Sequence, residues 1–239
     1  MKSLVLSSGF GTRLYPLTLT VAKGLLEYRG RALIDYVIDK IPQDVDIMVN
    51  VNKKFEDDFR RWREGILRQV KICVEPVYNE EQSLGAIGSI AYWIENESIT
   101  DDLMVLASDN YFEFDVPEFI REFNGRNTLV AVQDIGDINL ASKYGVVQLE
   151  GNRIVRFEEK PPEPKSSLVA TACWILPARV FPIMFEYSSA GKRDNLGSFI
   201  TYLIEEINEE VYAFPFTERW LDIGSMEVYE ALQREGDTD

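Results

Sequence analysis

The amino-acid sequence alternates short apolar runs with segments whose apolar residues recur at helical spacing. Short apolar runs between polar residues are typical of buried strands, and a period near that of the α-helix is typical of amphipathic helices. The predicted strands are residues 4–6, 46–51, 70–74, 103–107 and 128–132, and the helices predicted between them include residues 32–41 and 55–68. This alternation predicts βαβ units and a largely parallel sheet through about residue 135.

The later part of the chain has a different pattern, in which strands follow one another more closely. It predicts a strand pair at residues 143–147 and 154–161, helices at residues 179–187 and 198–208, and a strand at residues 210–214. Ser198 is the expected N-cap of the second helix. Together the two patterns predict an α/β fold, a Rossmann-like three-layer sandwich with a mixed, mostly parallel central sheet. We expect one domain over residues 1–239.

The composition narrows the functional classes. The 239-residue chain has 40 acidic and 25 basic residues, a net charge of −15, which disfavours general binding to nucleic acids or anionic membranes. It contains no histidine, which excludes histidine-based triads and histidine-ligated zinc. Cys73 and Cys173 lie in apolar runs and are expected in the core rather than in a disulfide. The N-terminus enters a strand directly, so we expect no signal peptide and a cytoplasmic location.

The stretch after the first strand, residues 7–23, reads SSGFGTRLYPLTLTVAK. Gly9 and Gly11 allow a tight turn with backbone N–H groups facing an anion, and Arg13 and Lys23 add two cations. Ligands of open α/β sheets bind at the carboxyl ends of strands, so the stretch suits a polyphosphate. It matches neither the Walker A pattern nor the dinucleotide fingerprint, which requires a third glycine where this chain has Leu14. The alternative is a glycine-rich turn that only joins a strand to a helix.

The pattern G-x-G-T-R-L-x-P-L-T, with a lysine ten residues after the arginine, resembles the signature of the sugar-phosphate nucleotidyltransferases, which include the glucose-1-phosphate thymidylyltransferases. The resemblance extends from the first strand to Met226 and the helix after it. It implies a nucleotide-binding part over about residues 1–135 and a sugar-binding part over about residues 136–230. The nucleotide-binding residues that it implies are Leu6, Ser8, Gly9, Gly11, Thr12, Arg13, Gly85 and Ser108.

Two aspartates are candidates for holding a metal ion. Asp109 follows the apolar run 103–107, where a carboxylate is well placed to hold a divalent cation against a phosphate. Asp222 lies in a short apolar segment before a glycine and a predicted helix. The alternatives are an Asx turn for Asp109 and a helix cap for Asp222. The resemblance implies that both aspartates bind Mg²⁺.

The motifs KYGVV and EEKPPEPKS carry the resemblance in the sugar-binding part. It implies contacts to a sugar phosphate from Lys23, Tyr144, Gly145, Glu159, Lys160 and Thr171. Adjacent strand residues point to opposite faces unless the chain bends, and we expect Pro161 to help supply the bend. The alternative for this run is a strand end with ordinary surface charges. The chain departs from the usual pattern at Ala22, Glu27-Tyr28 and Ala172.

The resemblance implies an enzyme that transfers a nucleotidyl group from a nucleoside triphosphate to a sugar 1-phosphate, with Arg13, Lys23, Lys160 and Asp109 as catalytic residues and Mg²⁺ as cofactor. The best guess for the substrates is dTTP or UTP with glucose 1-phosphate. Mannose, heptose or polyol phosphates with GTP or CTP are alternatives, as is a non-catalytic regulator that binds an NDP-sugar. We expect no C-terminal β-helix, and a homo-oligomer is compatible with the resemblance.

Overall fold

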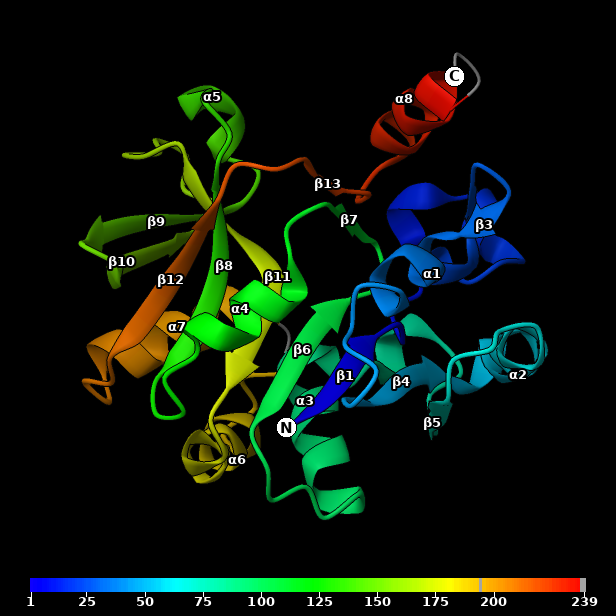
Figure 1. The fold of residues 1–239 in the computed structure, drawn as a ribbon, viewed down its shortest axis with the longest axis horizontal. Helices are drawn as coiled ribbons and strands as arrows, with labels where there is room; N and C mark the ends of the chain where they lie inside the picture. Colours follow the sequence, from blue (N-terminus) through cyan, green and yellow to red (C-terminus); the bar gives the residue numbers. More distant parts are fainter. Residues whose placement is uncertain (194, 237–239) are drawn as a thin grey trace. The chain divides into compact units, whose positions relative to one another are not determined.

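The computed structural model describes residues 1–193 and 195–236 and divides into two compact units (Figure 1). The first unit comprises Met1–Ser83, Leu106–Glu113 and the segment from Arg219 onward. The second comprises Leu84–Val105 and Phe114–Glu218. Each unit is therefore assembled from segments that are distant in sequence. The predicted single domain, with two functional parts that meet near residue 135, stays a prediction.

The first unit contains the predicted parallel strands. β1 (Lys2–Leu6) pairs in parallel with β4 (Asp46–Asn52), which pairs in parallel with β5 (Val70–Glu75). The intervening helices are α1 (Leu33–Ile38) and α2 (Glu56–Glu64), and α2 packs against β4 and β5. Apolar residues such as Leu4 and Val49 are fully buried in these strands. The carboxyl ends of β1, β4 and β5 consequently meet along one edge.

The remaining elements of the first unit carry its loops and a small second core. The opening stretch forms the 3-10 turns η1 (Thr12–Leu14), η2 (Leu17–Leu19) and η3 (Lys23–Leu25), and further turns are η4 (Lys53–Phe55) and η5 (Glu80–Gln82). Two antiparallel pairs follow, β2 (Glu27–Tyr28) with β3 (Arg31–Ala32), and β7 (Asn110–Phe112) with β13 (Trp220–Asp222). Helix α8 (Met226–Gly236) packs against β2 through the second core, which contains Leu14, Leu26, Tyr28, Leu33, Ile223 and Leu232.

The second unit is mostly antiparallel. Its strands run in the order β11 (Leu168–Leu176), β8 (Thr128–Asp134), β12 (Val211–Phe216), β10 (Arg153–Glu159) and β9 (Gly145–Glu150). β8 and β12 pair in parallel, whereas the pairs β8–β11, β10–β12, β9–β10 and β9–β11 are antiparallel. Its helices and turns are α3 (Gly85–Asn96), α4 (Val116–Glu122), α5 (Ile138–Ala141), η6 (Ala178–Val180), α6 (Phe181–Ser189) and α7 (Leu196–Glu205).

Strand β6 (Leu103–Ala107) begins in the second unit and ends in the first. The predicted α/β fold with a mixed sheet is confirmed, with the parallel pairs concentrated in the first unit. Cys73 and Cys173 are both buried, as expected, and are not joined in a disulfide. Within residues 1–193 and 195–236, every helix is too short or too polar to cross a lipid bilayer.

Candidate active site

The glycine-containing loop leaves β1 and doubles back on itself. Gly11 adopts a left-handed conformation with φ 62°, and its carbonyl oxygen accepts a 2.7 Å hydrogen bond from the buried hydroxyl of Thr18. The turn η1 then presents Arg13 to solvent, and Thr12 donates a 3.2 Å hydrogen bond to Glu80 Oε1. The predicted phosphate loop is therefore a compact turn with an exposed guanidinium group at its tip.

Lys23 and Asp109 form an ion pair between Lys23 Nζ and Asp109 Oδ2. The side chains are 13% and 26% exposed, so the pair is shielded from water but reachable. Burial disfavours the charged Asp109 carboxylate, but the Lys23 charge, with hydrogen bonds from Lys23 and Asn110, outweighs it and holds the pKa of Asp109 below its usual value. The predicted loop cation and the predicted metal ligand thus lie in direct contact.

Gly24 explains how this contact is possible. A Cβ at Gly24 would lie 2.7 Å from the hydroxyl oxygens of both Ser7 and Ser108. Ser108 Oγ in turn donates a 2.8 Å hydrogen bond to Ser7 Oγ, and its backbone N–H donates to Leu6 O at 3.0 Å. Only a residue without a side chain lets the three segments approach this closely, and that approach places Lys23 beside Asp109.

The second predicted metal ligand, Asp222, belongs to the strand that pairs with β7. Asp222 lies opposite Asn110 in this pairing, and Ile223 N–H donates a 3.0 Å hydrogen bond to Asp109 O. Trp220 Nε1 donates to the side-chain oxygen of Asn110 at 2.8 Å, which fixes the register. The backbone therefore brings the Asp109 and Asp222 segments side by side.

The donor set fits Mg²⁺, which is commonly held by one or two carboxylates together with substrate phosphates. No group of three or more His, Cys, Asp or Glu side chains that could hold a metal occurs in the part of the chain that the structure describes. Two carboxylates, Asp109 and Asp222, would have to be completed by phosphate oxygens and water. Asp109 forms its ion pair with the Lys23 ammonium group, and a bound cation would compete with Lys23 for this carboxylate or bind to it together with Lys23.

In the second unit, four of the predicted sugar-phosphate residues, Tyr144, Gly145, Glu159 and Lys160, lie around the end of β10, whereas Lys23 belongs to the first unit. Glu159 lies opposite Gly145 in the β9–β10 pair, and Gly145 also lies opposite Ala170 of β11. Lys160 follows Glu159 with φ 45°, a left-handed conformation that is rare for a residue with a side chain. Its N–H donates a 3.0 Å hydrogen bond to Tyr144 O, and its ammonium group lies 3.5 Å from Glu159 Oε1. The bend that brings the two charges together is therefore centred on Lys160 itself.

Glu159 and its neighbour Phe157 fit against two glycines. A Cβ on Gly197, in α7, would overlap the Phe157 ring and lie 2.5 Å from Glu159 Oε2. A Cβ on Gly145 would also overlap the ring and lie 3.3 Å from the same oxygen. The Phe157 ring and the Glu159 carboxylate therefore occupy space that a side chain at either glycine would fill.

Two predicted residues of the second unit have clear structural roles. The Thr171 hydroxyl is buried and donates a 3.0 Å hydrogen bond to Ala131 O. Gly85 begins α3 with φ 72°, a conformation that favours glycine. The hydrogen bond explains a threonine at position 171 and the positive φ explains a glycine at position 85, without any ligand. The predicted roles of Thr171 in sugar binding and of Gly85 in nucleotide binding therefore stay predictions.

Below the loop lies a set of buried polar residues that the sequence pattern did not predict, namely Asn50, Asn52, Glu75 and Ser7. Asn50 and Asn52 are fully buried at the end of β4, and Glu75 is 1% exposed at the end of β5. The sequence signal that could have indicated these residues is a polar residue at the end of an otherwise apolar strand. Gly197, next to Glu159, gave no comparable signal because its contacts join residues distant in sequence.

The fold and the donor set define an α/β protein with a candidate phosphate and metal site at the strand ends of its first unit. The family model for nucleotidyl transferases matches residues 2–237. The chain belongs to the nucleotidyl transferase family.

Two curated relatives have the name mannose-1-phosphate guanyltransferase. The chain is 28% identical, over 229 residues, to a putative mannose-1-phosphate guanyltransferase of Sulfolobus acidocaldarius, and 28% identical, over 244 residues, to a mannose-1-phosphate guanyltransferase of Debaryomyces hansenii. Each match covers 94% of this chain but only 60% and 61% of the relatives. The chain thus spans about three fifths of the length of these curated relatives.

A solved structure shares the fold over nearly its full length. It is a putative glucose-1-phosphate thymidylyltransferase from Bacillus anthracis in complex with a sucrose, with a TM-score of 0.83 and 24% identity. The match covers 99% of this chain and 95% of that one. At this identity the likeness supports the fold and leaves the substrates open.

Proposed function

We propose that the chain transfers a nucleotidyl group from a nucleoside triphosphate to a sugar 1-phosphate, releasing pyrophosphate and an NDP-sugar. The observation that carries the proposal is the Lys23–Asp109 ion pair beside the Asp222 segment, at the end of a glycine-containing loop. A transfer between phosphates needs cations for the polyphosphate and carboxylates for a metal, and the first unit provides both.

The proposed reaction is an in-line displacement at the α-phosphorus. An oxygen of the sugar phosphate forms the new P–O bond, and the bond to the bridging oxygen of the leaving pyrophosphate breaks. The attacking oxygen already carries negative charge near neutral pH, so the reaction needs no general base, which agrees with the absence of histidine. Catalysis then depends on positioning and on neutralising charge.

Each candidate residue has a role in this scheme. Arg13 stabilises the negative charge that develops on pyrophosphate, and Lys160, with help from Lys23, holds the sugar phosphate in line. Mg²⁺, when bound by Asp109 and Asp222, supplies charge neutralisation for the phosphates. Glu159 accepts hydrogen bonds from sugar hydroxyls, because a carboxylate offers several acceptor positions.

Two substrate pairs compete within this function. The sequence resemblance favours dTTP or UTP with glucose 1-phosphate. The names of the curated relatives favour GTP with mannose 1-phosphate, since both are mannose-1-phosphate guanyltransferases. The second pair is therefore the specific alternative, and both use the same proposed chemistry.

The test is pyrophosphate release by the full chain with Mg²⁺, crossing five nucleoside triphosphates with glucose, mannose and other sugar 1-phosphates. We expect release only with a particular nucleotide and a particular sugar phosphate together, and an NDP-sugar of matching mass. Reactions that contain a chelator or omit the sugar phosphate are the controls. A protein that releases no pyrophosphate with any pair but binds an NDP-sugar in calorimetry would contradict the proposal and favour a regulatory relative.

A further inference from the structure

Three polar side chains are buried under the start of the candidate phosphate loop. Asn50 and Asn52 are fully buried and Glu75 is 1% exposed. The parallel pairing sets Asn50 opposite Leu6 of β1, and Asn52 opposite Glu75 of β5. Burying polar groups costs free energy unless each finds a partner, so the contacts of these side chains should indicate their purpose.

Both the oxygen and the nitrogen of the Asn50 side-chain amide form hydrogen bonds, with Ser7 and Ser8 at the start of the loop and with Glu75. Its Oδ1 accepts a 2.8 Å hydrogen bond from Ser7 N–H. Its Nδ2 donates to Ser8 Oγ at 3.1 Å and to Glu75 Oε1 at 2.7 Å. Because a carboxylate oxygen accepts and an amide NH₂ donates, Glu75 fixes the direction of the Asn50 amide. The side-chain oxygen of Asn50 is thereby directed to the backbone of Ser7.

Asn52 holds the backbone of the next residue of the same segment, Ser8. Its Nδ2 donates a 2.9 Å hydrogen bond to Ser8 O, and its Oδ1 accepts a 3.1 Å hydrogen bond from Phe55 N–H. The backbone of Ser7 and the backbone and hydroxyl of Ser8 are therefore all held by β4. Ser8 is followed directly by the turn through Gly9 and Gly11 to Arg13, so these bonds set where the loop starts and how it is oriented.

We propose that Asn50, Asn52 and Glu75 are positioning residues for the nucleotide: Asn50 and Asn52 hold the loop that receives the triphosphate, and Glu75 orients Asn50. The inference rests on the proposed function, because it assigns these residues to the nucleotide and not to the sugar phosphate. A loop held by directed hydrogen bonds keeps its N–H groups aligned before the nucleotide arrives, which reduces the ordering cost of binding.

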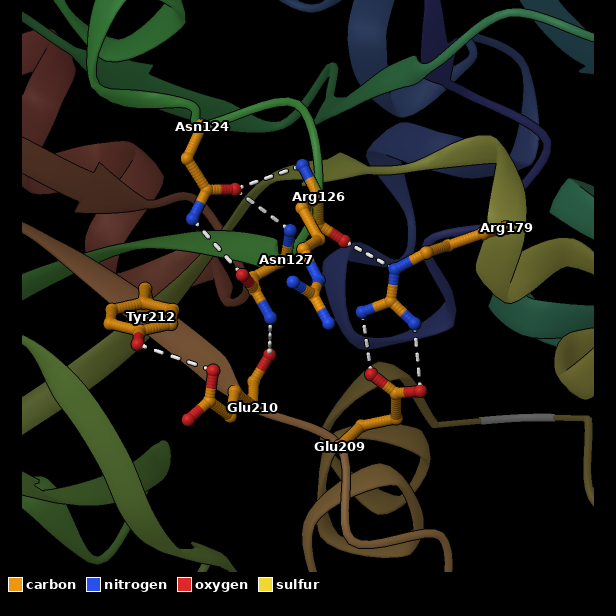
Figure 2. A network of polar contacts seen from close by, with 7 residues as sticks. All are labelled: Asn124, Arg126, Asn127, Arg179, Glu209, Glu210 and Tyr212. Atoms are coloured by element: carbon orange, nitrogen blue, oxygen red, sulfur yellow. Dashed lines mark hydrogen bonds and ion pairs between the residues drawn. The ribbon is translucent and has the colours of Figure 1, made fainter.

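The first variant is Asn50→Leu, which keeps the approximate size of the side chain and removes its three hydrogen bonds. We expect KM for the nucleoside triphosphate to rise by about tenfold, with KM for the sugar phosphate within about twofold of wild type. The matched control is Asn127→Leu, at another buried asparagine in the second unit (Figure 2). Asn127 accepts from Asn124 Nδ2 at 3.0 Å and donates to Glu210 O at 3.3 Å. The Asn127→Leu substitution should lower the free energy of unfolding without changing KM for the nucleotide or for the sugar phosphate.

A second pair of variants tests the step from Glu75 to the loop and also serves if Asn50→Leu does not fold. Glu75→Gln keeps an oxygen that can accept from Asn50 Nδ2, so KM for the nucleotide should stay near the wild-type value. Glu75→Leu removes that acceptor, and we expect KM for the nucleotide to rise severalfold. A purely structural role would change stability in both variants but would not raise KM for the nucleotide alone.

The outcomes separate this proposal from the proposed function. Active Asn50→Leu and Glu75→Leu variants with wild-type KM for the nucleotide would overturn the positioning role and leave the transferase function standing. If the wild type releases no pyrophosphate with any substrate pair, the proposed function fails, and calorimetric binding of the nucleoside triphosphates decides the positioning role. In that case weaker binding by Asn50→Leu supports it and equal binding overturns it. A wild type that binds no nucleoside triphosphate overturns both.

Discussion

The candidate residues of the two units are held in place by different kinds of contact. In the first unit, hydrogen bonds and an ion pair connect strand ends, as in the contacts of Asn50 to Ser8 and of Lys23 to Asp109. In the second unit, Glu159 fits into space left by Gly145 and Gly197, beside the ring of Phe157. The first arrangement depends on donors, acceptors and charge, with one close approach at Gly24, and the second depends mainly on volume.

This difference indicates how each unit should respond to substitution. Removing the charge of Asp109 without changing the size of its side chain should damage the first unit, because the ion pair with Lys23 depends on that charge. Adding a methyl group without changing charge should damage the second unit at its glycines.

The Asp109→Asn substitution keeps the size of the side chain and removes its charge. We expect turnover to fall by about a thousandfold or more, because the ion pair with Lys23 and the candidate metal ligand are lost together. Initial rates of pyrophosphate release measure the loss, and circular dichroism checks that the fold is retained. The control is Asp39→Asn, which breaks an exposed ion pair with Arg31 in the same unit. Turnover within about tenfold of wild type would remove Asp109 from the proposed chemistry.

The Gly197→Ala substitution adds one methyl group and no charge. Alanine ordinarily stabilises a helix by about 1 kcal/mol relative to glycine, but here the methyl group would overlap Phe157 and crowd Glu159. We therefore expect a loss of about 1–3 kcal/mol in the free energy of unfolding. We also expect KM for the sugar phosphate to rise about tenfold, with KM for the nucleotide unchanged. Denaturant unfolding and steady-state kinetics measure the two effects.

Gly65→Ala is the matched control for this prediction. Gly65 ends α2 with φ −87°, and its nearest neighbour to an added Cβ would be Trp62 O at 3.4 Å, an ordinary contact. This variant should leave both KM values unchanged. A Gly197→Ala protein at least as stable as wild type, with normal KM values, would show that volume does not hold Glu159.

The elements that the sequence predicted best depend on local pattern. The apolar runs of β1, β4, β5, β6 and β8 lie where expected, because a run of buried apolar residues is largely its own signal. Asp109 and Asp222 were proposed as metal ligands partly from local context, since each follows or ends a short apolar strand, and that role stays a prediction. That the two segments are adjacent came only from the pairing of β7 with β13.

The features that the sequence did not predict depend on contacts between distant residues or on competition between neighbours. Ser198 was the expected N-cap, but α7 begins earlier, and Asn195 is the N-cap, its side chain accepting from Ser198 N–H at 3.2 Å. Pro161 was expected to help supply the bend after β10, but the left-handed conformation of Lys160, the residue before it, was not predicted. The buried contacts of Asn50 and Glu75 join separate strands, so no local pattern specifies them.

Lys160 tests whether the strained bend and the charge have separate roles. A left-handed conformation costs a residue with a Cβ about 1–2 kcal/mol, a cost that glycine avoids. We therefore expect Lys160→Gly to be more stable than Lys160→Ala by about 1 kcal/mol, the reverse of the usual order for these residues. Both variants lose the ammonium group, so both should raise KM for the sugar phosphate about tenfold.

Thermal unfolding of the two variants measures their order of stability, and kinetics measure KM. The same two substitutions at Lys165, which does not have a positive φ, should give the usual order with alanine no less stable than glycine. Equal stability of the two Lys160 variants would show that the bend stores no strain. An unchanged KM in both would remove Lys160 from the sugar-phosphate site.

The smallest expected effect concerns an ion pair away from the candidate residues. Arg179 Nη1 and Nη2 donate to the two carboxylate oxygens of Glu209 at 2.8 and 2.6 Å, and Arg179 Nε donates to Arg126 O at 2.6 Å (Figure 2). The hydrogen bonds from Arg179 outweigh partial burial and hold the pKa of Glu209 below its ordinary value of 4.5. A carboxyl group with a lowered pKa in the folded state stabilises the protein above the unfolded-state pKa, and this contribution is lost as the pH falls through the folded-state pKa.

Glu209→Gln should therefore lower the free energy of unfolding at pH 7 by less than about 1 kcal/mol, because the Arg179 side chain is 39% exposed and screened by water. The difference from wild type should shrink as the pH falls below 4.5 and vanish below the folded-state pKa of Glu209. Urea unfolding at a series of pH values measures it. Glu210→Gln, which removes the same charge from the exposed neighbouring residue and keeps the Arg179–Glu209 ion pair, is the control. Turnover should be unchanged, because Arg179 donates its hydrogen bonds to Glu209 and Arg126, which are not candidate site residues. A stability difference between Glu209→Gln and wild type that grew as the pH fell would contradict the lowered pKa of Glu209.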